Sequence, residues 1–135
     1  MNASAGRARP APASTYRLQL QPGFGFADAA EIAGYLASLG VSHVYLSPVL
    51  QAAPGSRHGY DVIDHSRISA DLGGEPAFRD MVARFREHRL GVIADIVPNH
   101  MAIPAPESLN RQLWSVLRDG TGSKFAHWFD VDWAA

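Results

Sequence analysis

The sequence lacks cysteine altogether: none of its 135 residues is one. This absence excludes disulfide bridges and thiolate metal sites. A chain without disulfides fits the reducing interior of the cell, and we expect a cytoplasmic location. The sequence also lacks any apolar run approaching the ~20 residues that cross a bilayer, so we expect no membrane partner.

An excess of one charge is also missing. The formal net charge is −1, and no cluster of lysine or arginine stands out. This balance argues against a nucleic acid or an anionic membrane surface as the main partner. With 47% hydrophobic and 19% charged residues, the composition is that of a globular protein with enough chain for one small core.

The first residues, MNASAGRARPAPA, lack the apolar centre of a signal peptide. Their alanine, proline and arginine bias predicts a disordered leader over 1–13, with a transit peptide as the alternative.

Beyond the leader, hydrophobic periodicity alternates between the strand and helix patterns. The predicted elements are strands over 14–20, 41–49 and 92–97, separated by helices over 27–40 and from Glu75 to Gly91. Ile32, Ala33, Leu36 and Leu39 form the apolar stripe of the first helix, and 50–74 reads as a long loop. This β-α-β-α-β order predicts an α/β fold with a parallel sheet and right-handed crossovers. It fits either a doubly wound sheet or the start of a (β/α)8 barrel, which needs ~250 residues when complete.

The stretch GVIADIVPNH places a carboxylate, Asp95, inside the third predicted strand. A buried carboxylate is costly unless it is paired or hydrogen-bonded. Asp95 therefore either orders the sheet edge through an arginine or loop amides, or belongs to a polar site. Asn99 and His100 follow at the carboxyl end of the strand, where parallel α/β proteins build their sites. An ordinary turn asparagine and a surface histidine are the alternatives.

The predicted loop carries a second polar group on the same expected face. Gly59 permits a close backbone approach, and Tyr60 offers an aromatic face with a polar tip. Asp61 and Asp64 add carboxylates. Long loops in compact domains are usually functional or disordered, and this one is too patterned for disorder. The two groups together predict a pocket.

Residues of metal-binding type are present at positions 58, 61, 64, 65, 95 and 100. However, the first strand ends in QLQ instead of the paired histidines expected of a metal-dependent barrel hydrolase. The glycines of GFGF do not complete a dinucleotide fingerprint, because the third glycine position is occupied by Asp28. We therefore expect neither a metal nor a cofactor.

The tail over 102–135 is rich in aromatic residues. A short helix is predicted in PESLNRQLWSVLRDG, followed by SKFAHWFDVDW. The aromatic side chains are Trp114, Phe125, Trp128, Phe129 and Trp133. We interpret them as a small hydrophobic core, with a sugar-stacking platform as the alternative.

Two motifs resemble a known group of enzymes. DIVPNH resembles the D-x-V-x-N-H signature that ends the third strand in the α-amylase superfamily of (β/α)8-barrel glycosidases, and GYDVID resembles that superfamily's Gly-Tyr-x-x-x-Asp. Together with STYRLQL and FDVDW, the whole stretch 14–133 resembles the start of the maltooligosyltrehalose synthase family. The resemblance implies that 14–101 are the first three βα units of the barrel. It also implies that 102–135 begin an insertion over the active site.

The resemblance implies an activity for the parent protein. That family converts the reducing-end α-1,4 bond of a maltooligosaccharide into an α,α-1,1 bond by retaining transglycosylation. The superfamily takes its catalytic carboxylates from the fourth and fifth strands, and a third from after the seventh. We therefore expect no catalytic residue in this chain, an inactive fragment, and exposed hydrophobic surface. The alternatives are an α-glucan hydrolase of the same superfamily and a non-catalytic sugar-binding module.

Roles for individual residues also follow from the resemblance. Tyr60 would stack on the glucose at the cleavage point, and His100 would hydrogen-bond the same glucose. Asp95 would pair with an arginine beyond this chain, and Asp64 would stabilise the loop that holds Tyr60. Asn99 occupies a position that binds calcium in many amylases, but we expect no metal here.

Overall fold

The structure is a computed structural model that describes residues 11–134. The predicted leader over 1–13 therefore lies outside the described residues except for its last three. Its last residue, Ala13, donates its backbone N–H to Ser42 Oγ at 3.0 Å, next to the start of the first strand.

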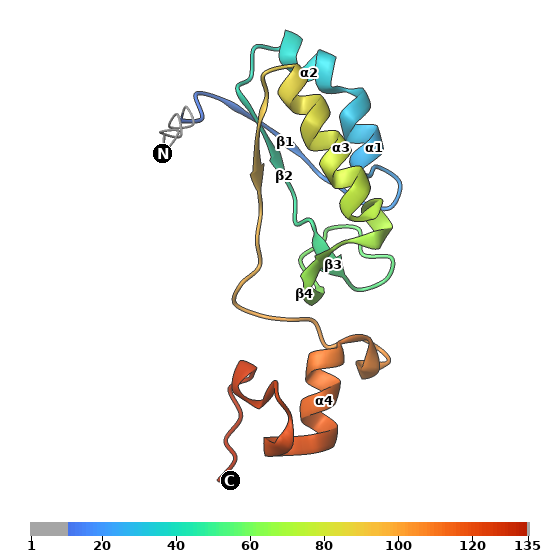
Figure 1. Cartoon of the computed structure of the whole chain (residues 1–135), viewed down its shortest axis with the longest axis vertical. Helices are drawn as coiled ribbons and strands as arrows, with labels where there is room; N and C mark the ends of the chain where they lie inside the picture. Colours follow the sequence, from blue (N-terminus) through green and yellow to red (C-terminus); the bar gives the residue numbers. More distant parts are fainter. Residues whose placement is uncertain (1–10, 135) are drawn as a thin grey trace, which may run out of the picture.

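A three-stranded parallel sheet forms the centre of the fold (Figure 1). Its strands are β1 (Thr15–Leu18), β2 (His43–Leu46) and β5 (Gly91–Ala94), in the order β1-β2-β5. The crossovers run through α1 (Phe26–Glu31) with α2 (Ala33–Ser38), and through α3 (Gly74–Glu87). All three helices lie on one side of the sheet. The predicted β-α-β-α-β order is confirmed, and within the described residues the sheet stays open.

The core lies between the helices and the sheet. Its fully buried members include Phe26, Leu36, Val44, Leu46, Met81 and Phe85. The predicted helix over 27–40 is interrupted at Ile32, which serves as the boundary between α1 and α2. Leu39 was predicted to face the core, but it lies past the end of α2 and is 47% exposed. The core therefore holds one face of β1 and β2, while the other face is available for a site.

A short antiparallel hairpin replaces most of the loop that was predicted over 50–74. It consists of β3 (Leu50–Ala52) and β4 (Val62–Ile68). The prediction of a loop was wrong here because β3 has only three residues and its pairing shifts register twice, so no alternating pattern marks it. The hairpin projects beyond the carboxyl ends of β1 and β2.

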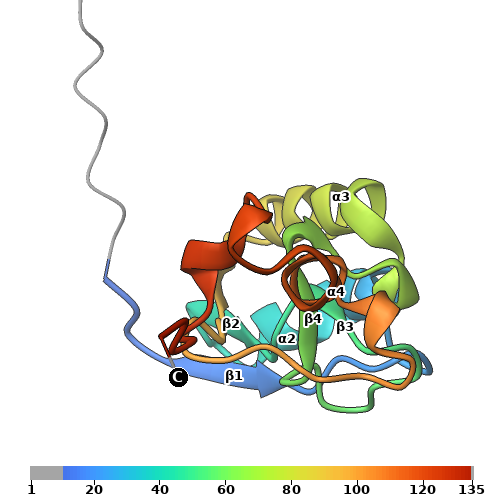
Figure 2. The ribbon, with the colours of Figure 1, turned by 90° about the horizontal axis from the view of Figure 1, so that it is seen from below.

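The third parallel strand ends earlier than predicted, at Ala94 instead of Val97. Asp95 is the first residue past the strand, although its N–H still donates to the Leu46 carbonyl at 3.0 Å. The chain then runs through an irregular segment and a 3-10 helix (Glu107–Leu109) to α4 (Arg111–Asp119). Figure 1 and Figure 2 place α4 beyond the β3–β4 hairpin. The segment before α4 is joined to the hairpin, because the Ala102 N–H donates to the Val62 carbonyl of β4 at 2.7 Å.

The aromatic tail is less buried than the sequence predicted. Trp114, Trp128 and Trp133 are 43%, 52% and 46% exposed, so the interpretation as a closed hydrophobic core is wrong for these three side chains. Leu117 and Val131 are also exposed, and they add to the exposed hydrophobic surface that we expected of this chain. No helix within 11–134 has the length and apolar character needed to cross a membrane.

Candidate functional site

The candidate site lies where the three parallel strands end. The loop between β3 and β4, residues 53–61, is called the Tyr60 loop and reaches back over this edge. The Tyr60 hydroxyl donates to Asp95 Oδ2 at 2.6 Å. Asp95 is placed there because it directly follows β5. The Tyr60 side chain is 37% exposed, so its ring keeps a surface that a ligand can cover. The structure thus brings together two of the residues that the sequence singled out from separate motifs.

Two further residues join this contact, and sequence reasoning missed both. Arg17 of β1 and Tyr45 of β2 are register partners, and the Arg17 guanidinium lies 5.9 Å from the centroid of the Tyr45 ring. Arg17 Nη2 is also 3.4 Å from the Tyr60 hydroxyl. A signal was present in the sequence, because Arg17 precedes buried Leu18 and Tyr45 stands between buried residues of β2, so both face away from the core.

The charges of this cluster are set by its hydrogen bonds. The hydrogen bond from Tyr60 lowers the pKa of Asp95, and weaker contributions from Tyr45, the Ile96 amide and Arg17 act in the same direction against partial burial. The hydrogen bond to Asp95 raises the pKa of the Tyr45 phenol, and the Arg17 charge opposes that rise. At neutral pH the cluster therefore offers an anionic acceptor, a guanidinium and two phenols, which are groups suited to binding hydroxyls.

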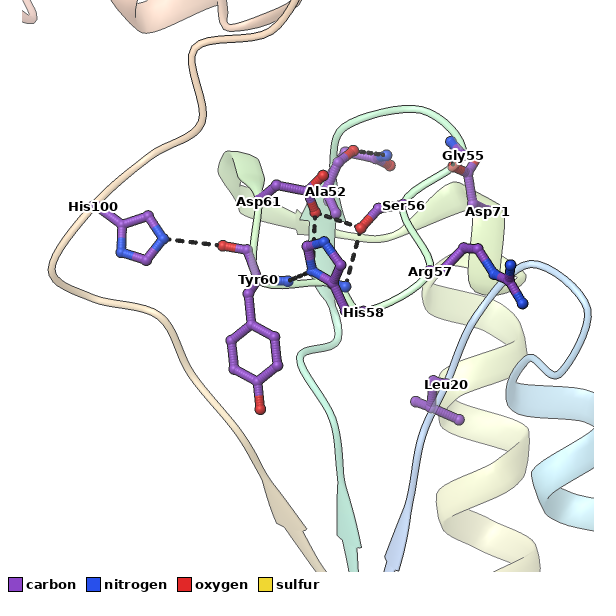
Figure 3. A network of polar contacts seen from close by, with 12 residues as sticks. Leu20, Ala52, Gly55, Ser56, Arg57, His58, Tyr60, Asp61, Asp71 and His100 are labelled. Atoms are coloured by element: carbon purple, nitrogen blue, oxygen red, sulfur yellow. Dashed lines mark hydrogen bonds and ion pairs between the residues drawn. The ribbon is translucent and has the colours of Figure 1, made fainter.

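The Tyr60 loop is held by contacts within itself (Figure 3). The Ser56 hydroxyl donates to Asp61 Oδ1 and accepts the Gly59 N–H at 3.0 Å. The Tyr60 N–H donates to His58 Nδ1 at 3.1 Å, and the two rings stack at a centroid distance of 6.1 Å. Asp61 thus fixes the turn that carries Tyr60, and its role in supporting a sugar pocket stays a prediction.

The predicted ligand His100 lies on the other side of the same loop. Its Nε2 donates to the Tyr60 carbonyl at 3.2 Å, and its Nδ1 is 3.0 Å from Asn99 Oδ1. Figure 3 shows the imidazole facing this carbonyl while the Tyr60 ring points toward the strands. Both partner atoms are acceptors and a neutral imidazole carries one N–H, so the ring donates to the Tyr60 carbonyl, and a sugar hydroxyl that accepts from Nε2 would have to displace this contact. The sugar-binding role of His100 stays a prediction.

Asp64 has different neighbours from those expected. It lies within β4 opposite Gln51, and it accepts hydrogen bonds from the Ser66 N–H at 2.9 Å and the Ser66 hydroxyl at 2.6 Å. Partial burial raises the pKa of Asp64, but the Ser66 bonds and Arg67 together lower it by more. A side-chain hydrogen bond from Gln112 of α4 also lowers the pKa of Asp64. Asp64 thus lies on β4, past the turn that Asp61 holds, and its neighbours come from β4 and α4.

The possible metal ligands do not gather into a site. Among residues 11–134, no group of three or more histidine, aspartate or glutamate side chains is arranged to hold an ion. His65 Nε2 instead contacts the Val97 carbonyl at 2.8 Å. The expectation that no metal binds stays a prediction of the sequence.

Comparison with known proteins places this geometry in a family. Residues 30–115 match the family described as alpha amylase, catalytic domain. A solved structure of maltooligosyltrehalose synthase from Arthrobacter ramosus shares 48% identity, covers 90% of the chain and superposes with a TM-score of 0.86. The prediction of an α/β fold that forms part of a (β/α)8 barrel is confirmed.

Two curated relatives show the same relationship at different distances. A Mycobacterium tuberculosis protein that carries the name of a maltooligosyl trehalose synthase is 46% identical over 125 residues, 89% of this chain. The intracellular maltogenic amylase of Bacillus subtilis is 31% identical over 97 residues, 72% of this chain. The chain spans 16% of the first relative and 15% of the second. The match over 30–115 covers well over half of the sequence, and the chain belongs to the α-amylase family as part of its catalytic domain.

Proposed function

We propose that this chain is the first part of a maltooligosyltrehalose synthase. The complete protein would convert the reducing-end α-1,4 bond of a maltooligosaccharide into an α,α-1,1 bond. One observation carries the proposal: similarity to the Arthrobacter ramosus synthase extends over 90% of the chain at 48% identity. Similarity to the maltogenic amylase is both shorter and weaker, at 72% coverage and 31% identity.

The contribution of this chain is sugar binding. Tyr60 presents a partly exposed ring that can cover one face of a glucose unit, and Asp95 fixes the ring through its hydroxyl. Asp95 itself is unsuited to be the general acid, because a carboxyl with a lowered pKa holds its proton poorly. Retaining chemistry requires two carboxylates ~5 Å apart, and the resemblance places those beyond this chain.

The reaction can be tested with the protein encoded by the complete reading frame. Maltopentaose is incubated with the enzyme, and both reducing ends and free glucose are measured. The proposal predicts that reducing ends fall without a matching release of glucose, because the new bond joins two anomeric carbons. A rise in reducing ends would overturn the proposal and support the hydrolase, which the similarity to the maltogenic amylase favours as second candidate.

A third outcome addresses the non-catalytic alternative. If the sugar is unchanged but binds, with binding weakened by Tyr60→Ala, the protein is a sugar-binding module and the synthase assignment falls. The cytoplasmic location belongs to the same proposal, and fractionation of cells that express the full reading frame tests it.

A further inference from the structure

Arg17 stands in a row of side chains across the three parallel strands, followed by Tyr45 and Ile93. Arg17 is opposite Tyr45 in the register of β1 and β2, and Tyr45 is opposite Ile93 in the register of β2 and β5. Asp95 follows two residues after Ile93, on the same face. Leu18 and Leu46 point to the opposite face, into the core. The row therefore belongs to the face that carries the candidate site.

The Arg17 side chain lies close to two tyrosines, Tyr45 of the row and Tyr60 of the loop between β3 and β4. Its Nη2 lies 3.4 Å from the Tyr60 hydroxyl, which donates its own proton to Asp95. Its guanidinium carbon lies 5.9 Å from the centroid of the Tyr45 ring, within the range of a cation–π contact. The hydroxyl of Tyr60 thus sits between a cation and an anion, so its position depends on both.

We propose that Arg17 is a positioning residue of this site. Its guanidinium holds the Tyr60 hydroxyl on Asp95 and keeps the Tyr45 ring in place, so that the Tyr60 ring presents a fixed face to the glucan. The matched family region begins at residue 30 and leaves Arg17 outside it, and the resemblance of STYRLQL gives Arg17 no role. The effect of Arg17 on glucan binding rests on the proposed function. The effect of Arg17 on the positions of the Tyr45 and Tyr60 side chains does not.

An ordinary surface arginine would behave differently. Exposed charges contribute little to stability and tolerate replacement. Arg79 on α3 is such a residue: its side chain is 74% exposed and pairs with Glu75 along the same helix. Arg79→Met therefore makes the same chemical change as Arg17→Met, away from the site, and serves as the matched control.

The positioning role is tested in this chain by NMR of ζ-13C-labelled tyrosine. The four tyrosine signals are assigned with single Tyr→Phe variants. Asp95 and Tyr60 raise the pKa of the Tyr45 phenol, and the positive charge of Arg17 lowers it. Arg17→Met removes this charge. Arg17→Met should therefore shift the Tyr45 titration to higher pH and change the Tyr60 signal, while Arg17→Lys should retain most of the charge effect. Unchanged signals in a folded Arg17→Met variant would overturn the proposal.

The consequence for the sugar is tested in the full-length enzyme. If Arg17 acts through Tyr60, Arg17→Met lowers kcat/KM for maltopentaose roughly tenfold, and it causes little further loss in a Tyr60→Phe background. Equal losses in both backgrounds would show that Arg17 acts elsewhere. An enzyme without mutase activity would refute the proposed function, but the NMR titration would still decide the role of Arg17.

Discussion

Gly59→Ala is the substitution that most directly tests how the Tyr60 loop is built. Gly59 has φ of +80°, and a Cβ there would lie 2.9 Å from the Pro48 carbonyl oxygen and 3.3 Å from Pro48 Cβ. The left-handed conformation costs a non-glycine residue about 1–2 kcal/mol. Moving the backbone out of the overlap costs about 1–3 kcal/mol more, as in other overpacked sites. We expect a total loss of roughly 2–5 kcal/mol and a displaced Tyr60 ring.

Gly55→Ala separates the two costs. Gly55 has φ of +75°, but a Cβ added there meets no atom within 4 Å. Its replacement should therefore cost only the conformational term of about 1–2 kcal/mol. Urea unfolding of both variants, followed by circular dichroism, gives the difference directly if the m-value is unchanged. Equal destabilisation by the two substitutions would refute the reasoning, because it would leave no cost for the contact with Pro48.

Three further predictions concern the cap of α4, the pH response of the site and the core. Asn110 is fully buried, accepts the Leu113 N–H at 3.0 Å and donates to the Ala102 carbonyl at 3.0 Å. Asn110→Ala should therefore cost roughly 1–3 kcal/mol and reduce the helical circular dichroism signal, and an unchanged spectrum would contradict this cap. Tyr60→Phe removes the main cause of the lowered pKa of Asp95, so 13C NMR of the carboxyl should show a higher midpoint. Because the folded pKa of Asp95 is lowered, its stabilisation is present above the unfolded pKa of ~3.9 and is lost as the pH falls through the folded pKa. The stability gap between wild type and Tyr60→Phe should therefore close in acid, and a constant gap would argue against this linkage. Phe85→Ala in the fully buried core should cost roughly 3–5 kcal/mol in urea unfolding, and a loss below ~1 kcal/mol would show that the helices do not pack as described.

The parallel sheet was predictable because each of its strands carries a local pattern. β1 and β2 alternate, and β5 begins at a glycine and is apolar up to Asp95. The β3–β4 hairpin was not predictable in the same way. Its short strand pairs with irregular register, and pairing between distant residues leaves no local signature.

The candidate site was predictable only in part. The motifs placed Tyr60 and Asp95 on one edge, and the structure joins them directly. The contribution of Arg17 and Tyr45 depends on the register between strands, which sequence periodicity alone does not define. The contacts of Asp61 and Asp64 depend on where the turn after β3 ends and β4 begins. The pairing of β4 with β3 defines this boundary, and local sequence does not.

The claim that the Tyr60 site binds the glucan is tested most directly by comparing two tyrosine variants of the full-length enzyme. Tyr60 is 37% exposed at the site, whereas Tyr35 is 58% exposed on α2, on the helical side of the sheet. The account predicts that Tyr60→Ala lowers kcat/KM for maltopentaose by at least about tenfold, which corresponds to roughly 1.4 kcal/mol, while Tyr35→Ala leaves it unchanged. Equal kcat/KM values for the two variants would contradict the claim.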